Sequence, residues 1–412
     1  MDIALLKTQQ NWIRDELSRT IEFWLKHGWD HQNGGVYTCL GQQGEVLHTD
    51  KSVWMQGRGG WMFSYLCRLY GQKQEWLDFA RSCLEFGEQY CVDHSRGRRM
   101  YLHVTAKGHP VRWRTRFHSE GFFCIANAEF YGLTGETKYL DRAKAAYELY
   151  WNLFHRLIED PFEKDPLAMP DNRIGYTPDM RTIDLPMIYL NICSVMRRCD
   201  PENTALYDAR ADQCVDEIFR YHRKEDIHCT LETVGPDGEI IDSPLGRQIN
   251  PGHDIELSWF LMEYANYKGD RELHKKAEDI FHDAYTAGWD EEHGGLLNLL
   301  DLKYGAEQDI WYSCKIWWPQ TELLIAPLMA YRDTGNEAYH RIFTQALDYC
   351  KKQFSDPIYG EWYNGFSRDH TPFKHEPFSK GNPNKGPFHV LRALCMTDKL
   401  IDDILNNTPK GE

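Results

Sequence analysis

The feature that most constrains how this chain folds is a short polar linker that returns at a nearly constant interval. The five linkers are Tyr70–Lys73, Leu133–Glu136, Arg198–Pro201, Lys268–Asp270 and Thr334–Asn336. They lie about 64 to 70 residues apart, which leaves room for two helices of ordinary length in each unit. Over 412 residues this spacing predicts about six helix pairs.

Six helix pairs that close on themselves form an all-α fold, the (α/α)6 barrel, with inner helices around an axis and outer helices around them. An open α-solenoid is the alternative, because it also stacks helix pairs. Irregular loops and a tryptophan-rich interior favour the closed barrel. No shift in composition and no Pro/Ser-rich linker marks a second domain, so we expect one domain over residues 1–412, with Asn406–Glu412 frayed.

A second motif recurs where a helical pattern gives way to an extended segment. Trp29–Tyr37 and Trp289–Leu296 both begin with Trp-Asp and contain Gly-Gly, and Asp356–Tyr363 is a looser relative. These segments are expected to be equivalent corners of the repeat.

Strands are expected only as short hairpins that join helices on one face of the barrel. The extended stretches Met100–Val104 and Thr230–Val234 precede the turn sequences Lys107–Pro110 and Gly235–Gly238. Both are too short to form a sheet of their own.

Charge and composition exclude several classes of protein. The net charge of −15 argues against binding to nucleic acid or to anionic membrane surfaces. Aromatic residues make up 14% of the chain, which is typical of carbohydrate sites and also of large helical cores. The 12 cysteines lack paired spacing, which indicates free thiols in a reducing compartment. With no secretory signal pattern and no apolar run long enough to cross a membrane, we expect a cytoplasmic protein.

Three ionisable residues share one phase of the repeat. Arg58, Glu256 and Glu322 each lie thirteen residues before the glycine of the next linker. Met187 has the same phase before the third linker, so the position is not always charged. Equivalent positions on inner helices of a closed barrel converge on the axis, where buried charges are costly unless they bind something. The alternative is coincidence, because helix starts commonly carry polar residues.

Two histidines open apolar helical runs directly after a breaker. His253 follows Pro251-Gly252, and His389 follows Gly386-Pro387-Phe388. Glu256 lies three residues after His253, on the same helix face. The positive end of the helix dipole favours a neutral imidazole at His253, as a general base needs. Such a pair suits removal and return of a proton on opposite faces of one carbon, whereas an isolated histidine would more often cap or pack a helix start.

Three tryptophans lie close to these residues in the sequence. Trp54 is one helical turn before Arg58, and Trp317 and Trp318 lead into Glu322, where they supply a stacking ring. A metal site is the competing interpretation of His253 and Glu256, but a di-iron bundle needs two such motifs and two more glutamates. We therefore expect no metal. The chain also lacks the glycine-rich signatures of P-loop, Rossmann and hydrolase-elbow enzymes.

The combination of these motifs resembles the N-acylglucosamine 2-epimerase family, which includes the renin-binding protein and, more distantly, cellobiose 2-epimerases and a sugar aldose–ketose isomerase. The matching stretches span nearly the whole chain. They are Phe23-Trp24 with Asp30–Leu40, Val53–Arg58, Leu245–His253, Lys315–Glu322, Tyr359–Trp362 and Gly386–His389.

The resemblance implies an (α/α)6 barrel in which His253 and His389 are the catalytic acid/base pair. It also implies that Arg58, Glu256 and Glu322 line the sugar site, with Trp54 and Trp317 or Trp318 nearby. Cellobiose 2-epimerases carry an additional histidine where this chain has Met187, which places the chain nearer the N-acylglucosamine branch.

The expected activity is therefore the interconversion of N-acetyl-D-glucosamine and N-acetyl-D-mannosamine, with no redox cofactor or catalytic metal. The alternatives are epimerisation or isomerisation of free hexoses such as mannose, a glycoside hydrolase on the same barrel, and a non-catalytic protease-binding role. The resemblance also implies a homodimer. It raises ATP as an allosteric activator, but no phosphate-cradling glycine loop lies near Asp171–Thr182, which speaks against ATP dependence.

Overall fold

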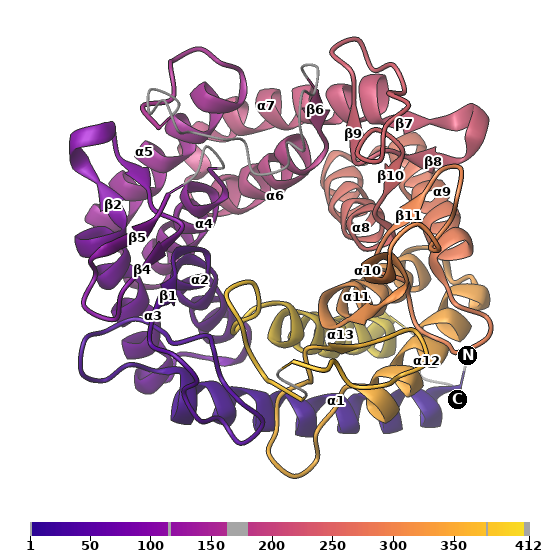
Figure 1. The fold of residues 1–412 in the computed structure, drawn as a ribbon, viewed down its shortest axis with the longest axis horizontal. Helices are drawn as coiled ribbons and strands as arrows, with labels where there is room; N and C mark the ends of the chain where they lie inside the picture. The colour runs from indigo at the N-terminus through magenta and orange to yellow at the C-terminus, as the bar shows by residue number, and fades with distance from the viewer. Residues whose placement is uncertain (1, 114–116, 163–179, 376–377, 408–412) are drawn as a thin grey trace.

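The inner layer of the fold is a closed ring of six helices. The computed structural model describes residues 2–113, 117–162, 180–375 and 378–407. The inner helices are α2 (Val53–Tyr70), α4 (His118–Thr134), α6 (Asp184–Cys199), α8 (Pro251–Lys268), α11 (Trp317–Thr334) and α13 (His389–Asn407). Each packs against the next, and α13 returns to contact α2 (Figure 1). The predicted (α/α)6 barrel is confirmed.

A second layer of helices surrounds this ring. The outer helices are α1 (Ile3–Phe23), α3 (Gln74–Phe86), α5 (Thr137–Phe154), α7 (Thr204–Glu217), α9 (Arg271–Gly288) and α12 (Glu337–Gln353). Five pairs are consecutive in the chain and meet at the five predicted linkers, whereas the sixth pairs α13 with α1 (Figure 1). Gly269 and Gly335 end α8 and α11 at φ values of 67° and 69°, a left-handed conformation that glycine adopts without strain.

Residue patterns explain which helices lie inside. From Pro319 to Tyr331, α11 is buried on every side, as expected for a helix that is apolar all round. By contrast, α9 buries one stripe that includes Ala277, Ile280, Phe281 and Ala284, at spacings of three and four. Burying a side chain such as Phe281 contributes about 1.5–3 kcal/mol to folding.

The seam between the first and last helices is held by one buried carboxylate. Asp398 on α13 accepts hydrogen bonds from Arg14 Nε (2.6 Å) and Gln10 Nε2 (3.0 Å) on α1. It also accepts one from Tyr70 Oη on α2 at 2.7 Å. Three helices therefore meet at Asp398, which closes the ring.

The three recurrent segments are confirmed as equivalent corners. Trp29 bridges to Val36, Trp289 to Leu296 and Ser355 to Trp362 by isolated antiparallel pairing. In each corner an aspartate forms a buried ion pair with a lysine. The lysine lies shortly before an inner helix in the sequence. The pairs are Asp30–Lys51 (2.7 Å), Asp290–Lys315 (2.7 Å) and Asp356–Lys380 (2.9 Å). These pairs fix the entry of α2, α11 and α13 at one end of the barrel.

The strands are shorter than predicted and all antiparallel. One three-stranded sheet is formed by β1 (Lys51–Ser52), β4 (His103–Val104) and β5 (Pro110–Arg112). The two-stranded pairs are β2 (Val92–Asp93) with β3 (Arg99–Met100), β6 (Arg181–Thr182) with β9 (Thr233–Val234), β7 (Arg223–Lys224) with β8 (Cys229–Thr230), β10 (Gln248–Ile249) with β11 (Leu300–Asp301), and β12 (Lys315–Ile316) with β13 (Gly365–Phe366). A single turn of helix, α10 (Ile310–Ser313), precedes β12.

The predicted strands Met100–Val104 and Thr230–Val234 are wrong as continuous elements. Each is divided between two strands that pair with different partners: β3 with β2 and β4 with β1, and β8 with β7 and β9 with β6. The turn after the first is confirmed, since β4 and β5 pair across it. The predicted fraying is also wrong at its start, because α13 continues to Asn407, while residues 408–412 lie outside the described part.

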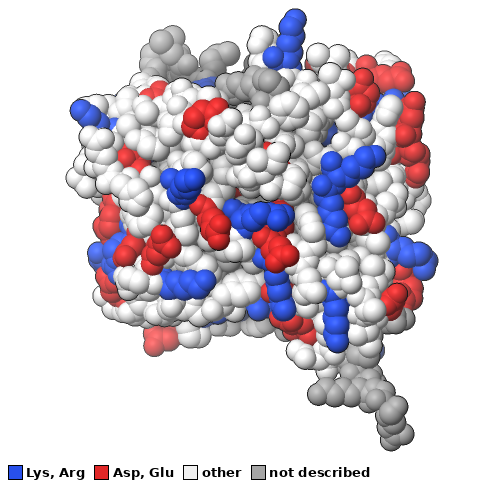
Figure 2. Space-filling view, turned by 90° about the horizontal axis from the view of Figure 1, so that it is seen from below, with Lys and Arg blue, Asp and Glu red and all other residues white. Residues whose placement is uncertain are grey.

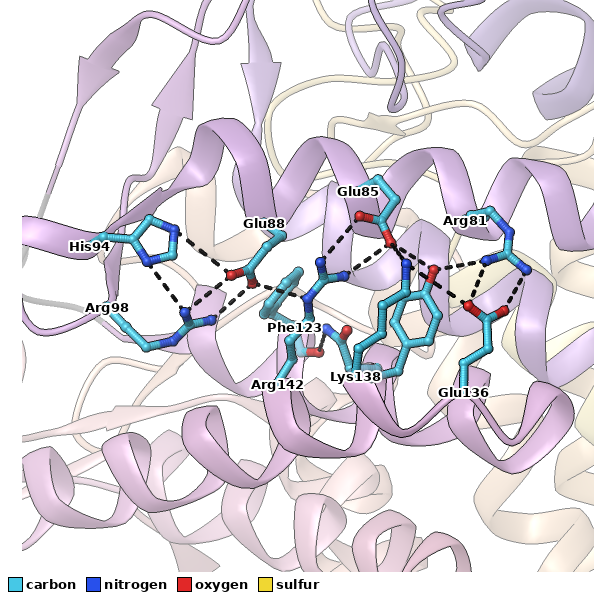
Figure 3. Close-up of polar contacts among 11 residues, drawn as sticks. Arg81, Glu85, Glu88, His94, Arg98, Phe123, Glu136, Lys138 and Arg142 are labelled. Carbon is cyan, nitrogen blue, oxygen red and sulfur yellow. Dashed lines mark hydrogen bonds and ion pairs between the residues drawn. The ribbon is translucent and has the colours of Figure 1, made fainter.

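Ion pairs link neighbouring outer segments at the surface. Glu85 on α3 contacts Lys138 (3.0 Å) and Arg142 (3.1 Å) on α5, and Glu88 contacts Arg98 (2.9 Å), as Figure 3 shows. On the face seen in Figure 2, Lys and Arg alternate with Asp and Glu. Exposed pairs of this kind contribute at most about 1 kcal/mol each.

Two further predictions concern thiols and membranes. All 12 cysteines are free thiols, and only Cys199 among them is not buried. Among the described residues, no helix combines the length and the apolar character that crossing a lipid bilayer requires.

Candidate active site

Two histidines lie at the starts of the two inner helices, α8 and α13, that flank α11. His253 is the third residue of α8, where Asn250 caps the helix by accepting the His253 N–H at 3.2 Å. His389 is the first residue of α13. Both imidazoles pack against Trp318, with ring centroids 5.0 and 5.8 Å away. Gly252 allows this approach, because a Cβ there would lie 2.6 Å from the Trp318 ring.

His253 is anchored by a glutamate outside its own helix. Its Nδ1 lies 2.9 and 3.1 Å from the two carboxylate oxygens of Glu232. Burial by itself would lower the pKa of His253, but the charge and hydrogen bond of Glu232 raise it to about 9. The expectation of a neutral His253 is therefore wrong, because a carboxylate in direct contact outweighs the partial charge of a helix end.

His389 also contacts a glutamate through Nδ1, but its surroundings favour the neutral imidazole. Its Nδ1 lies 2.9 Å from Glu322 Oε1. Burial, followed by the positive charges of Arg58 and Arg392, holds the pKa of His389 well below its usual range. With both Nδ1 atoms turned to carboxylates, the Nε2 atom of each ring is the one left for a substrate.

The in-phase glutamates meet at a single guanidinium group. Glu256 and Glu322 are the sixth residues of α8 and α11. Arg392 Nη2 lies 2.5 Å from Glu256 Oε1 and 2.7 Å from Glu322 Oε1, and it lies 3.3 Å from His389 Nδ1. Trp259 Nε1 donates to the other Glu322 oxygen at 2.9 Å. The predicted convergence of these two positions is therefore confirmed, and Arg392 supplies the compensating charge.

Arg58, the sixth residue of α2, faces the same region from across the ring. Its guanidinium carbon lies 4.0 Å from the Phe122 ring centroid and 4.6 Å from that of Phe388. Burial lowers the pKa of Arg58 to about 9, opposed by the charge of Glu256. Within the described chain its buried Nε has no hydrogen-bond partner.

The other predicted residues are placed differently. Trp54 is half-buried beside His118, at 5.6 Å between centroids, and its buried Nε1 lacks a partner among the described residues. Trp317 is buried in the main core, with Lys385 Nζ 5.9 Å from its ring, and Met187 is buried in the same core. Of the two neighbouring tryptophans, only Trp318 packs against the histidines.

Three side chains of the site lie close enough together to hold a metal ion. Ligand atoms of Glu256, Glu322 and His389 lie within 4.8 Å of one another. The Arg392 guanidinium already pairs with both carboxylates and touches the histidine. The positive charge that these ligands require is therefore provided by the protein.

Two residues of the site were not predicted from the sequence. Arg392 follows His389 by three residues, as Glu256 follows His253, and that parallel was a usable signal. Glu232 lies between β8 and β9 with no pattern to single it out. Most of Asp171–Thr182, the stretch considered for a phosphate loop, lies outside the described residues.

The chain is similar to known carbohydrate epimerases over most of its length. Residues 35–393 match the model of the family described as N-acylglucosamine 2-epimerase (GlcNAc 2-epimerase). The chain is 36% identical to the N-acylglucosamine 2-epimerase of Rattus norvegicus, covering 97% of this chain and 94% of the relative. It is 26% identical to the cellobiose 2-epimerase of Ruminococcus albus, covering 93% of this chain and 96% of that protein.

The fold is similar to that of a cellobiose 2-epimerase from Spirochaeta thermophila, with a TM-score of 0.82, 21% identity and 98% of each chain covered. The family match includes both histidines, with all of α8 and the first five residues of α13. The chain therefore belongs to the N-acylglucosamine 2-epimerase family.

Proposed function

We propose that this protein interconverts N-acetyl-D-glucosamine and N-acetyl-D-mannosamine by inverting carbon C2. The observation that carries the proposal is the pair of imidazoles packed on Trp318, each anchored through Nδ1 to a carboxylate. Relatives that are 36% and 34% identical over 97% of the chain are named N-acylglucosamine 2-epimerase, which supports the choice of substrate.

The chemistry begins with the ring-opened sugar. Its C1 carbonyl acidifies the hydrogen on C2, so a neutral imidazole removes that hydrogen as a proton. The electron pair moves onto the C1 oxygen and gives an enolate, which the positive charge of the Arg58 guanidinium would stabilise. The second histidine, in its imidazolium form, then gives its proton to the opposite face of C2. Acid–base help of this kind is worth about 10²–10⁴-fold per group.

The balance of the reaction limits what else is needed. One proton leaves C2 and one proton returns, so no electrons are transferred and no group is exchanged. We therefore infer that no redox cofactor takes part, and that ATP, if it acts, is an effector and not a reactant. We infer that no catalytic metal takes part either, because the Arg392 guanidinium already pairs with Glu256 and Glu322.

The assembly and location of the enzyme belong to the same proposal. We infer that residues 1–412 form one catalytic domain, a view supported by the shared core of the first and last helices. The twelve free thiols favour a reducing compartment such as the cytoplasm. A homodimer is inferred from the family resemblance.

Deuterium incorporation tests the proposal directly. In D₂O, the wild type should convert N-acetylmannosamine to N-acetylglucosamine with deuterium at C2, and His253→Ala and His389→Ala should not. If mannose is converted and the N-acetyl sugar is not, the enzyme acts on free hexoses instead. Deuterium incorporation that persists unchanged in both variants would overturn the two-histidine assignment.

The hydrolase alternative has a specific difficulty. A glycosidase needs one carboxyl group that keeps its proton to protonate the leaving oxygen. Glu256 and Glu322 are both engaged by the Arg392 guanidinium, so neither carboxyl group stands free to serve a leaving oxygen. Release of a reducing end from an oligosaccharide, retained in His389→Ala, would restore this alternative.

A further inference from the structure

The contact between Glu232 and His253 is unlike the other contacts of the site. Both carboxylate oxygens of Glu232 lie within 3.1 Å of His253 Nδ1. Across the described ranges, 2–113, 117–162, 180–375 and 378–407, these are the only hydrogen bonds of that carboxylate. The negative charge of Glu232 is therefore directed at one imidazole.

The backbone holds Glu232 in this position from two sides. Its N–H donates to the carbonyl of Gln248 at 3.0 Å, in the segment that leads into α8. Its carbonyl accepts from the N–H of Ile183 at 3.0 Å, directly before α6. The position of the carboxylate is thus fixed by the starts of two inner helices, although Glu232 lies on neither.

Glu322, the glutamate that contacts His389, differs from Glu232 because it is also paired with a cation. Glu322 Oε1, which binds His389, also accepts from Arg392 at 2.7 Å, and its other oxygen accepts from Trp259 at 2.9 Å. The charge of Glu322 is therefore already compensated when it meets His389. An ion pair with a neutralised carboxylate stabilises an imidazolium less than one with a free carboxylate.

Other groups also face His253. The charged and titratable ones on the surrounding elements are Glu232, Asp184, Asp254, Glu256 and His389. Asp184 already binds His118 Nε2 at 2.8 Å, and Glu256 binds Arg392. Burial, reinforced by the charge of Glu232, raises the pKa of Asp254 well above its usual value. Glu232 remains as the carboxylate in direct contact with His253.

We propose that Glu232 is a positioning residue that keeps His253 in the imidazolium form, so that His253 gives the proton to C2 and His389 takes one from it. This inference rests on the proposed epimerisation. We call forward the direction in which His389 is the base. In this direction the C2–H bond breaks and the proton passes to His389 Nε2, while the electron pair forms the enolate. The enolate then collapses, the Nε2–H bond of His253 breaks, and a new C2–H bond forms on the other face.

One consequence is that a single turnover does not return the two histidines to their starting protonation states. After the forward reaction His389 carries the proton and His253 is neutral, which is the form that the reverse reaction requires. Exchange of protons with the solvent returns the original form before the next forward turnover. The two directions therefore use two arrangements of the same single proton.

Titration of His253 by NMR tests the inference without any substrate. The His253 signal is identified by its absence from His253→Ala, and its midpoint is compared between the wild type and Glu232→Gln. We expect a midpoint near 9 in the wild type and a fall of more than about 1 pH unit in the variant, because contact with a carboxylate shifts a pKa by about 1–3 units. The alkaline limb of kcat/KM should fall by the same amount.

Controls separate this inference from a general effect of losing a carboxylate. Glu225→Gln, an exposed position in the turn between β7 and β8, should leave both the midpoint and the limb unchanged. If Glu232→Gln does not fold, Glu232→Asp keeps the charge with a shorter side chain and should lower the midpoint by less.

Two results would overturn the inference: an equal His253 midpoint in Glu232→Gln and wild type, or a wild-type midpoint at or below about 6.5. A wild type that epimerises neither N-acetyl sugar, with a midpoint that still falls in Glu232→Gln, would refute the proposed function. In that case the contact between Glu232 and His253 would stand.

Discussion

The two histidines of the site differ in their surroundings far more than in their positions. Each opens an inner helix, packs on Trp318 and turns Nδ1 to a glutamate. His253 meets a carboxylate whose charge is uncompensated, whereas His389 meets one that Arg392 has neutralised. The pKa of His253 consequently rises to about 9, and that of His389 falls well below its usual range.

This difference shows how a symmetric scaffold supports an asymmetric reaction. A helical repeat places equivalent side chains at equivalent heights, which suits a reaction on two faces of one carbon. The repeat by itself would give two similar imidazoles. Charges added from a loop, at Glu232, and from the last helix, at Arg392, make one an acid and the other a base.

The largest expected effect is the loss of either imidazole. His253→Ala and His389→Ala should each slow epimerisation by about 10²–10⁴-fold, since each removes one acid–base group. The comparison becomes sharper with C2-deuterated substrates in H₂O. Each variant should still wash out deuterium from the one epimer whose C2 faces the remaining histidine, and exchange should be slower when that residue is the protonated His253.

Equal exchange of both epimers in both variants would contradict separate faces for the two histidines. A double variant, His253→Ala with His389→Ala, serves as the control and should exchange neither epimer. Thermal unfolding of the three variants should be compared, so that a loss of rate is not mistaken for a loss of structure.

The second largest effect is expected from replacing Arg392. This residue pairs with Glu322, the anchor of His389, and not with Glu232, the anchor of His253. Arg392→Met should leave Glu256 and Glu322 buried without their cation, at a cost of about 3–5 kcal/mol in the free energy of unfolding. The pKa of His389 should rise, because a guanidinium that lowers it has been removed. Urea unfolding measures the first effect, and the acid limb of kcat/KM measures the second.

Arg341→Met, an exposed position on α12, is the matched control and should change neither quantity. An Arg392→Met protein as stable as the wild type would show that the two carboxylates do not depend on this guanidinium. An acid limb that stays in place would break the comparison between the two histidines.

Sequence reasoning reached the residues that the repeat itself specifies. Linker spacing predicted the ring, and counting back from the linkers predicted Glu256 and Glu322 at one height. It missed Glu232, because a hydrogen bond across twenty-one residues of loop has no periodic signature. It also predicted a neutral His253. The position of His253 at a helix start can be recognised in the sequence, but its contact with Glu232 from another segment cannot. The sixth helix pair, α13 with α1, likewise joins the two ends of the chain.

The pH profile should reflect the difference between the two histidines. His253 must carry a proton, so kcat/KM should fall as pH rises through about 9. His389 must be neutral, so kcat/KM should fall on the acid side only well below pH 6.5, the ordinary midpoint of histidine. Each limb should change the rate tenfold per pH unit. A profile with both limbs near pH 6.5 would mean that the two imidazoles are equivalent.

The smallest expected effect concerns Trp318, the contact that the two histidines share. Trp318→Phe keeps an aromatic ring but shortens it, which loosens packing on both imidazoles and opens space over Gly252. Aromatic contacts are worth about 0.5–1.5 kcal/mol, so kcat should fall by about 2–10-fold with both pH limbs in place. Trp311→Phe, half-exposed on α10, is the control and should not alter kcat. A shift of one limb alone would instead show that Trp318 supports one histidine more than the other, and would assign the asymmetry partly to packing rather than to charge.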